Sequence, residues 1–163
     1  MNRAYAILGL LVVAVVGVAV ATRVLGRQDD KSLIQDSLRQ SLEASRKGEP
    51  GGVLEALSSK FKFNDQEASG NTSLIANYIR NQKPDITVTN QTPIITGDEA
   101  RITSPVKLKI SLPVFGDKTV TLPDVVMVFH KETAHEFLIF PVTKWRLAEV
   151  QAGNVDPTAI GIE

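Results

Sequence analysis

The chain has 163 residues, with 18 lysines and arginines, 18 aspartates and glutamates, and no cysteine. The missing cysteine excludes disulfide bonds, a thiol nucleophile and a cysteine-ligated zinc site. Three basic residues lie within residues 1–27, so the remainder has a net charge of about −3. A mildly acidic domain without a basic stripe argues against nucleic acid as a partner.

An uncharged apolar stretch runs from Ala4 to Ala21. As a helix it would reach about 27 Å, which is close to the roughly 30 Å hydrocarbon core of a bilayer. We therefore predict a single-pass transmembrane helix within residues 1–27 that contacts the lipid bilayer through Ala4–Ala21. Flanking cations can extend to the lipid headgroups, and here they are Arg3, Arg23 and Arg27.

A cleaved signal peptide is the alternative for this segment. Ala19-Val20-Ala21 fits a small-residue cleavage site, and the mature chain would then begin at Thr22. We favour the anchor because the apolar stretch is long for a signal-peptide core and because Arg23 would directly follow the cut.

The orientation of the domain follows from two opposing rules. The cations that follow the anchor favour a cytoplasmic domain, whereas a first apolar helix with almost no preceding chain commonly exports what comes after it. We expect an extracytoplasmic domain on a single-pass membrane protein.

Three helices are predicted after the anchor. Residues 32–47 have an amphipathic pattern that ends before Gly48, a residue type suited to a helix C-terminus. A second helix is expected from Gly52 to about Lys60, followed by a polar loop over residues 63–70. A third helix, capped by Asn71 or Thr72, is expected to end at Gln82, before Pro84.

After Pro84 the apolar period changes from 3.6 to 2. This alternation predicts antiparallel strands with one buried face, most clearly where Val106, Leu108, Ile110 and Leu112 alternate with polar residues. Two long strands are expected over residues 118–130 and 137–150, and a tail over residues 151–163. The predicted fold is therefore α+β, with three helices packed on a curved four- to five-strand antiparallel sheet.

Several short segments together suggest a family. The long helix ends in Ala44-Ser45-Arg46-Lys47-Gly48 and is followed by Val53-Leu54-Glu55-Ala56-Leu57, and the helix Thr72–Gln82 leads to Pro84. Strands that open with Gly97-Asp98-Glu99-Ala100-Arg101-Ile102 and close with Thr143-Lys144-Trp145-Arg146-Leu147 complete the pattern.

This layout resembles the nuclear-transport-factor-2-like superfamily, which has a cystatin-like α+β cone. The resemblance implies a cone-shaped domain over residues 28–150. It is similar in particular to the membrane-anchored members, such as inner-membrane scaffold subunits of type IV secretion systems, which work by docking to partners. Other members are isomerases and dehydratases, so the fold alone does not select a function.

The candidate site residues are aromatic. Tyr78 and Trp145 are the candidates to line a ligand pocket, although each also suits a core position. Phe61 and Phe63 flank the loop after the second helix and are the candidates for contact with a partner.

No catalytic residue, metal site or cofactor is predicted. A steroid-isomerase-like site needs a carboxylate base inside the cone, whereas the acids here cluster in turns and at helix ends. His130, Glu132, His135 and Glu136 lie in one predicted turn, where a metal would be held loosely. The favoured function is a membrane-anchored, non-enzymatic domain that docks a protein partner or a second copy. The alternative is a cone-pocket enzyme or carrier for a small apolar ligand.

Overall fold

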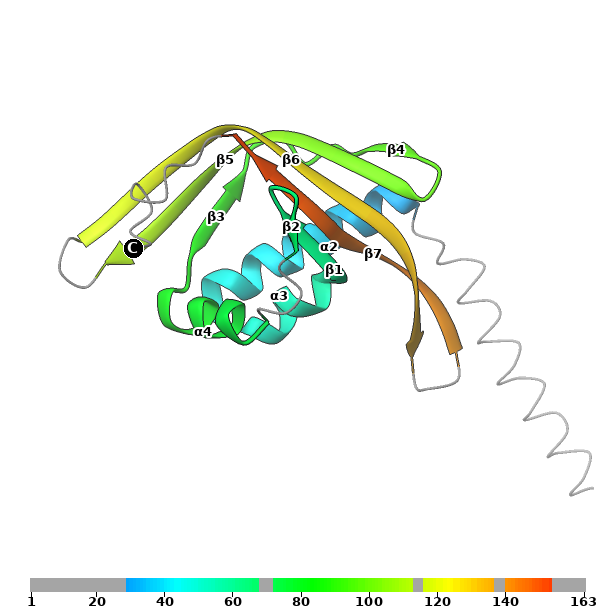
Figure 1. Ribbon diagram of the computed structural model, residues 1–163, viewed down its shortest axis with the longest axis horizontal. Helices are drawn as coiled ribbons and strands as arrows, with labels where there is room; N and C mark the ends of the chain where they lie inside the picture. Colours follow the sequence, from blue (N-terminus) through cyan, green and yellow to red (C-terminus); the bar gives the residue numbers. More distant parts are fainter. Residues whose placement is uncertain (1–28, 68–71, 113–115, 137–139, 154–163) are drawn as a thin grey trace, which may run out of the picture.

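The computed structural model describes residues 29–67, 72–112, 116–136 and 140–153. Helices α2 (Asp30–Lys47), α3 (Pro50–Ala56) and α4 (Thr72–Gln82) lie beneath an arched sheet (Figure 1). The strands, in chain order, are β1 (Leu57–Phe63), β2 (Gln66–Glu67), β3 (Asp85–Val88), β4 (Ile94–Thr96), β5 (Glu99–Leu112), β6 (Gly116–Glu136) and β7 (Phe140–Ala152). The predicted α+β class is therefore confirmed. Every described element after Pro84 is a strand, as expected, but β1 and β2 precede it.

The sheet has seven strands in the order β2-β1-β7-β6-β5-β3, and β4 also pairs with β5. Strands β5, β6 and β7 form the expected antiparallel meander. Strand β1, by contrast, runs parallel to β7, with Leu57 opposite Leu147 and Phe63 opposite Val150. The prediction of a purely antiparallel sheet of four to five strands is wrong, because this edge of the sheet is built from a segment that precedes Pro84.

Strand β1 also corrects the predicted second helix. The expected helix from Gly52 to Lys60 ends at Ala56, and the expected loop over residues 63–70 includes the two-residue strand β2. Leu54, Leu57 and Phe61 fit a helical stripe, but Phe61 and Phe63 also alternate with lysines as a strand requires. Pairing with β7 decides in favour of the strand over the helix, and that partner lies about ninety residues away in sequence.

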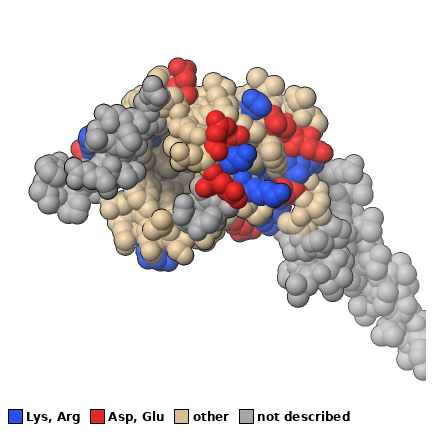
Figure 2. All heavy atoms as spheres, in the orientation of Figure 1, with Lys and Arg blue, Asp and Glu red and all other residues tan. Residues whose placement is uncertain are grey.

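Basic and acidic side chains are intermixed on the face of the molecule in Figure 2. Two such pairs on the sheet are Arg101–Glu99 and Lys109–Asp117, each 2.7 Å apart. Exposed pairs of this kind keep the surface hydrated and contribute little to stability.

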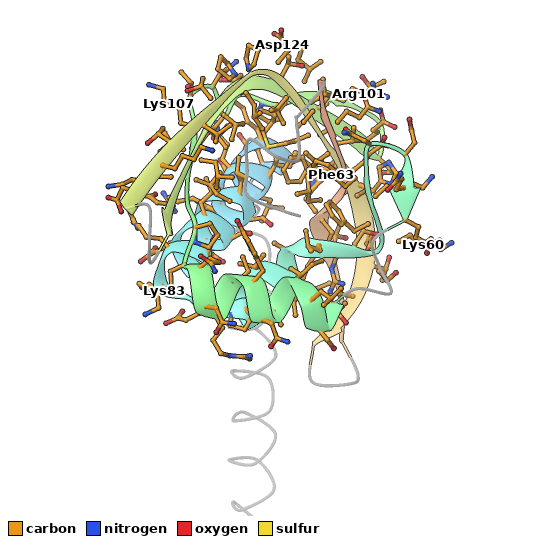
Figure 3. The ribbon with its side chains drawn as sticks, turned by 60° about the vertical axis from the view of Figure 1, so that its left-hand side comes forward. Lys60, Phe63, Lys83, Arg101, Lys107 and Asp124 are labelled. Carbon is orange, nitrogen blue, oxygen red and sulfur yellow. The ribbon has the colours of Figure 1, made fainter. Side chains whose placement is uncertain are left out.

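The core lies between α2 and the concave face of the sheet (Figure 3). Ile34 and Leu38 of α2 pack in one cluster with Ile102, Phe129 and Trp145. The other members of that cluster are Val88, Ala100, Val106, Val125, Met127 and Ala152. The expected shared interior of the first helix and the long strands is therefore present.

Among the described residues, no helix combines the length and the apolar character that crossing a membrane requires. The predicted transmembrane helix at Ala4–Ala21 and its alternative cleavage site lie outside the described residues. Of the predicted tail over residues 151–163, Gln151 and Ala152 belong to β7, and residues 154–163 lie outside the described residues.

Candidate functional site

Trp145 on β7 ties the sheet to the first turn of α2. Its indole Nε1 donates a hydrogen bond to Asp30 Oδ1 at 3.0 Å. Lys131 on the neighbouring strand β6 places its Nζ 3.0 Å from Asp30 Oδ2 and 5.6 Å from the centroid of the indole ring. The hydrogen bond from Trp145, followed by that from Lys131, holds the pKa of the Asp30 carboxyl below its usual value. Asp30 is therefore an anionic link between α2 and the sheet at neutral pH.

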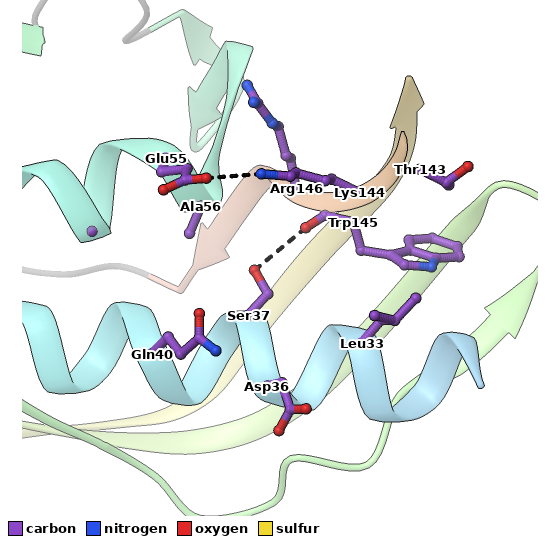
Figure 4. A pocket seen from close by; sticks show the side chains of 11 residues that line it. Leu33, Asp36, Ser37, Gln40, Glu55, Ala56, Thr143, Lys144, Trp145 and Arg146 are labelled. Atoms are coloured by element: carbon purple, nitrogen blue, oxygen red, sulfur yellow. Dashed lines mark hydrogen bonds and ion pairs between the residues drawn. The ribbon is translucent and has the colours of Figure 1, made fainter. Parts of the chain in front are cut away.

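A cavity of about 320 Å³ lies between α2, α3 and β7 (Figure 4). Leu33, Ser37 and Gln40 line it from α2, and residues 143–146 line it from β7. The hydroxyl of Ser37 donates to the carbonyl of Trp145 at 3.4 Å. Its lining mixes charged, polar and apolar groups, so this cavity is not a dry pocket for a purely apolar ligand.

An ion pair lies in the wall of this larger cavity. Lys144 Nζ donates to Glu55 Oε1 at 2.9 Å, which joins β7 to α3. This hydrogen bond and the charge of Lys144 lower the pKa of the Glu55 carboxyl. A carboxyl with a lowered pKa is fully ionised near neutral pH and is a poor general acid there.

A second cavity, of about 150 Å³, lies between α3, β1 and α4. The apolar residues in its lining are Leu54, Leu57, Phe61 and Ile75. The polar residues in its lining are Ser58, Ser59, Thr72 and Arg146. Arg146 lines both cavities and is therefore the residue that they share.

Arg146 lies beside a carboxylate but is incompletely satisfied by it. Its Nε is shielded from solvent and has no hydrogen-bond partner within the part of the chain that the structure describes. The nearest carboxylate oxygen, Oε2 of Glu132, is 3.7 Å away. The other oxygen of Glu132 accepts a hydrogen bond from Ser58 Oγ at 2.6 Å. The arrangement is a half-buried guanidinium that retains capacity for an anion.

The predicted aromatic residues occupy different places. Trp145 lines the larger cavity, Phe61 lines the smaller one, and Tyr78 is in the lining of neither. Tyr78 is 38 % exposed on α4, and partial burial raises the pKa of its hydroxyl. Phe63 is 43 % exposed at the end of β1. The two cavities thus bring together Trp145, Phe61 and Arg146, but not Tyr78.

Sequence reasoning missed Arg146 as a site residue and considered Glu132 only as a weak metal ligand. The available signal was the alternation of Lys144, Trp145 and Arg146, which places the arginine on the face opposite the indole. Within the described residues, no group of three acidic or histidine side chains is arranged to hold a metal ion.

Comparisons with known proteins identify the fold. No protein-family model matches the sequence, and no curated protein matches it. Among solved structures, the chain is similar to a nuclear transport factor 2 (NTF2-like) superfamily protein from Salmonella enterica, with 15 % identity, a TM-score of 0.55, and coverage of 76 % of this chain and 89 % of that one.

Two further structures share the fold. The CaMKII hub of S. rosetta has 14 % identity and a TM-score of 0.58, over 77 % of this chain and 97 % of the hub. A candidate ketosteroid isomerase from Shewanella frigidimarina has 15 % identity and a TM-score of 0.52, over 72 % of this chain and 92 % of that one. At these identities the likeness establishes an NTF2-like fold and nothing about activity.

Proposed function

We propose that this chain is a membrane-anchored association domain, which binds a protein partner or a second copy of itself and does not convert a substrate. The observation that carries the proposal is the packing of α2 into the concave face of the sheet. Ile34 is completely buried there, and Leu38 is 5 % exposed. With α2 packed into the concave face, the exposed side chains at the rim are left for contact with other molecules.

The rim of the molecule offers apolar side chains for such contact. Phe63 at the end of β1 is 43 % exposed, and Leu74 on α4 is 66 % exposed. Exposed large apolar side chains are common singly, but they are also the residues from which protein interfaces are built. The likeness in fold to a CaMKII hub supports association as a role that this fold can have.

The alternative is a carrier or enzyme for a small ligand, which the two cavities and the likeness to a candidate ketosteroid isomerase support. Catalysis by a carboxyl near neutral pH requires a raised pKa in an apolar site. Here Glu55, a carboxyl in the wall of the larger cavity, has its pKa lowered by Lys144. We therefore rank a carrier above an enzyme within this alternative.

Photo-crosslinking in native membranes tests the association. Benzoylphenylalanine at position 63 of the full chain preserves an aromatic side chain and is expected to form one discrete adduct, identified by mass spectrometry. The same group in place of the exposed Lys107 on β5 is the matched control and is expected to give none. A chain that stays monomeric by sedimentation in detergent and forms no adduct at position 63 would overturn the proposal.

A further inference from the structure

Arg146 and the smaller cavity form a site of defined chemistry that is separate from the proposed association. We propose that Arg146 anchors the carboxylate of a small organic acid, whose apolar part occupies the smaller cavity. The ligand is a monovalent anion of about the size of benzoate.

The first step in the argument is the unused capacity of the guanidinium. A guanidinium presents five N–H donors in a planar fork that matches a carboxylate. Among the described residues, Nε of Arg146 is shielded from solvent without a hydrogen bond, although a buried donor left unmatched is costly. A carboxylate that pairs with the guanidinium would supply the missing acceptor once the partly exposed side chain turns Nε toward the cavity.

The second step is the position of Glu132. Its Oε2 is 3.7 Å from Arg146 Nε, beyond hydrogen-bonding distance, while its Oε1 is held by Ser58 at 2.6 Å. Glu132 therefore lowers the cost of burying the guanidinium without filling its fork. The same negative charge disfavours a dianion such as phosphate, so the site suits a single negative charge.

The third step is the mixed lining of the cavity. Leu54, Leu57 and Ile75 supply apolar groups from α3, β1 and α4. Ser58, Ser59, Thr72 and Arg146 add polar groups to the same lining. Figure 4 shows the Arg146 side chain leaving β7 away from the Trp145 ring, so the cation is not covered by the indole. A small ligand with an anionic end and an apolar end matches this combination of groups.

Methyl-detected NMR of the full chain in detergent micelles tests the site, with benzoate as the probe and benzamide as its neutral isostere. Benzoate is expected to shift the methyl signals of Leu54, Leu57 and Ile75 saturably and to leave the exposed Ile94 on β4 unchanged. Because benzamide lacks the charge, we expect it to bind about tenfold or more weakly, as the loss of one charged hydrogen bond implies.

Two substitutions and a control complete the test. Arg146→Met is expected to abolish the preference for benzoate, whereas Arg101→Met, which removes an exposed arginine on β5, is expected to preserve it. Glu132→Gln removes the competing charge and should tighten benzoate binding several-fold. Equal binding of benzoate and benzamide to the unaltered chain, or no saturable shift of the methyl signals of these three residues, would overturn the proposal. Neither result depends on a variant that folds poorly. Crosslinking at position 63 is a separate measurement. A negative result for benzoate binding therefore says nothing against the proposed association.

Discussion

At the scale of single residues, Asp30 makes a connection that its position in the sequence does not reveal. It lies in the first turn of α2, where an acid is already favoured by the helix dipole. Its carboxylate also accepts hydrogen bonds from Trp145 on β7 and Lys131 on β6. The sequence predicts the dipole effect alone, because the two partners are more than one hundred residues away.

We predict that Asp30→Asn lowers the free energy of unfolding by about 1 kcal/mol at pH 7, the scale of a partly exposed charged hydrogen bond. The pKa of Asp30 is lowered in the folded state from its usual value of 3.8. The contribution of its charge is therefore complete above pH 3.8 and is lost as the pH falls through the folded-state pKa.

Urea denaturation of both chains in mild detergent at pH 7 and at pH 3 measures this difference. The difference in the free energy of unfolding between the unaltered chain and Asp30→Asn should be smaller at pH 3 than at pH 7. Asp124→Asn, at an exposed position on β6, should change stability at neither pH. If the difference in the free energy of unfolding were the same at both pH values, the charge of Asp30 would not be what stabilises the contact.

At the scale of elements, α2 ends as its sequence predicts. Gly48 adopts φ +75°, and its N–H donates to the carbonyl of Ser45 at 3.0 Å. Glycine reaches this left-handed conformation without a steric cost. A methyl group at Gly48 would also come within 2.9 Å of Lys83 Cγ.

Gly48→Ala is therefore expected to destabilise the chain by about 1 kcal/mol or more. Gly51→Ala in α3 is the matched variant, because nothing lies within 4 Å of the added methyl group and its φ is not positive. It should stabilise the chain by about 0.5 kcal/mol through helix propensity. Thermal unfolding of the two variants should give shifts of opposite sign, and shifts of the same sign would refute this account of the helix end.

The other elements show which parts of the fold can be predicted from the local pattern of apolar residues. The helices α2 and α4 and the strand β5 follow from the period of their apolar residues, since each buries one face. The centre of β6 follows instead from a continuous apolar run, because Met127, Val128 and Phe129 are all buried. Strand β1 does not follow from local pattern, because the sequence of Leu57–Phe63 fits a helix end and a strand equally well. Its pairing with β7 decides in favour of a strand.

The candidate site could not be predicted from the sequence for the same reason. Arg146, Glu132 and Ser58 come from three different strands, and only the pairing of those strands in the sheet brings them together. Trp145 was found because a lone tryptophan is conspicuous, whereas an arginine in a strand is not.

At the scale of the whole molecule, the start of α2 limits the length of chain between the folded domain and the predicted anchor. The helix begins at Asp30, so the stretch between it and residues 1–27 is very short. Asp30 is in turn bound to β6 and β7. If residues 1–27 span a bilayer, we expect the domain to lie close to the headgroups, with little freedom to move away from them.

The absence of cysteine makes the orientation directly measurable, since an introduced cysteine is the only thiol. Asp124→Cys places it at an exposed position on β6, and Ile34→Cys places it in the core as the buried control. We predict that a membrane-impermeant maleimide labels position 124 in intact cells and labels position 34 only after denaturation. The reason is the expected export of the domain by an apolar helix that acts as a signal-anchor.

Labelling of position 124 only after permeabilisation would place the domain on the cytoplasmic side, as the cations after the apolar stretch would favour. The state of the N-terminus separates the remaining possibilities. An anchor retains residues 1–21 and resists extraction from membranes with alkaline carbonate, whereas a mature chain that begins at Thr22 and is released would show that Ala4–Ala21 is a signal peptide. In that last case the association proposed for the folded domain would stand, but the membrane would have no part in it, because the contacts described between α2 and the sheet are made by residues from Asp30 onward.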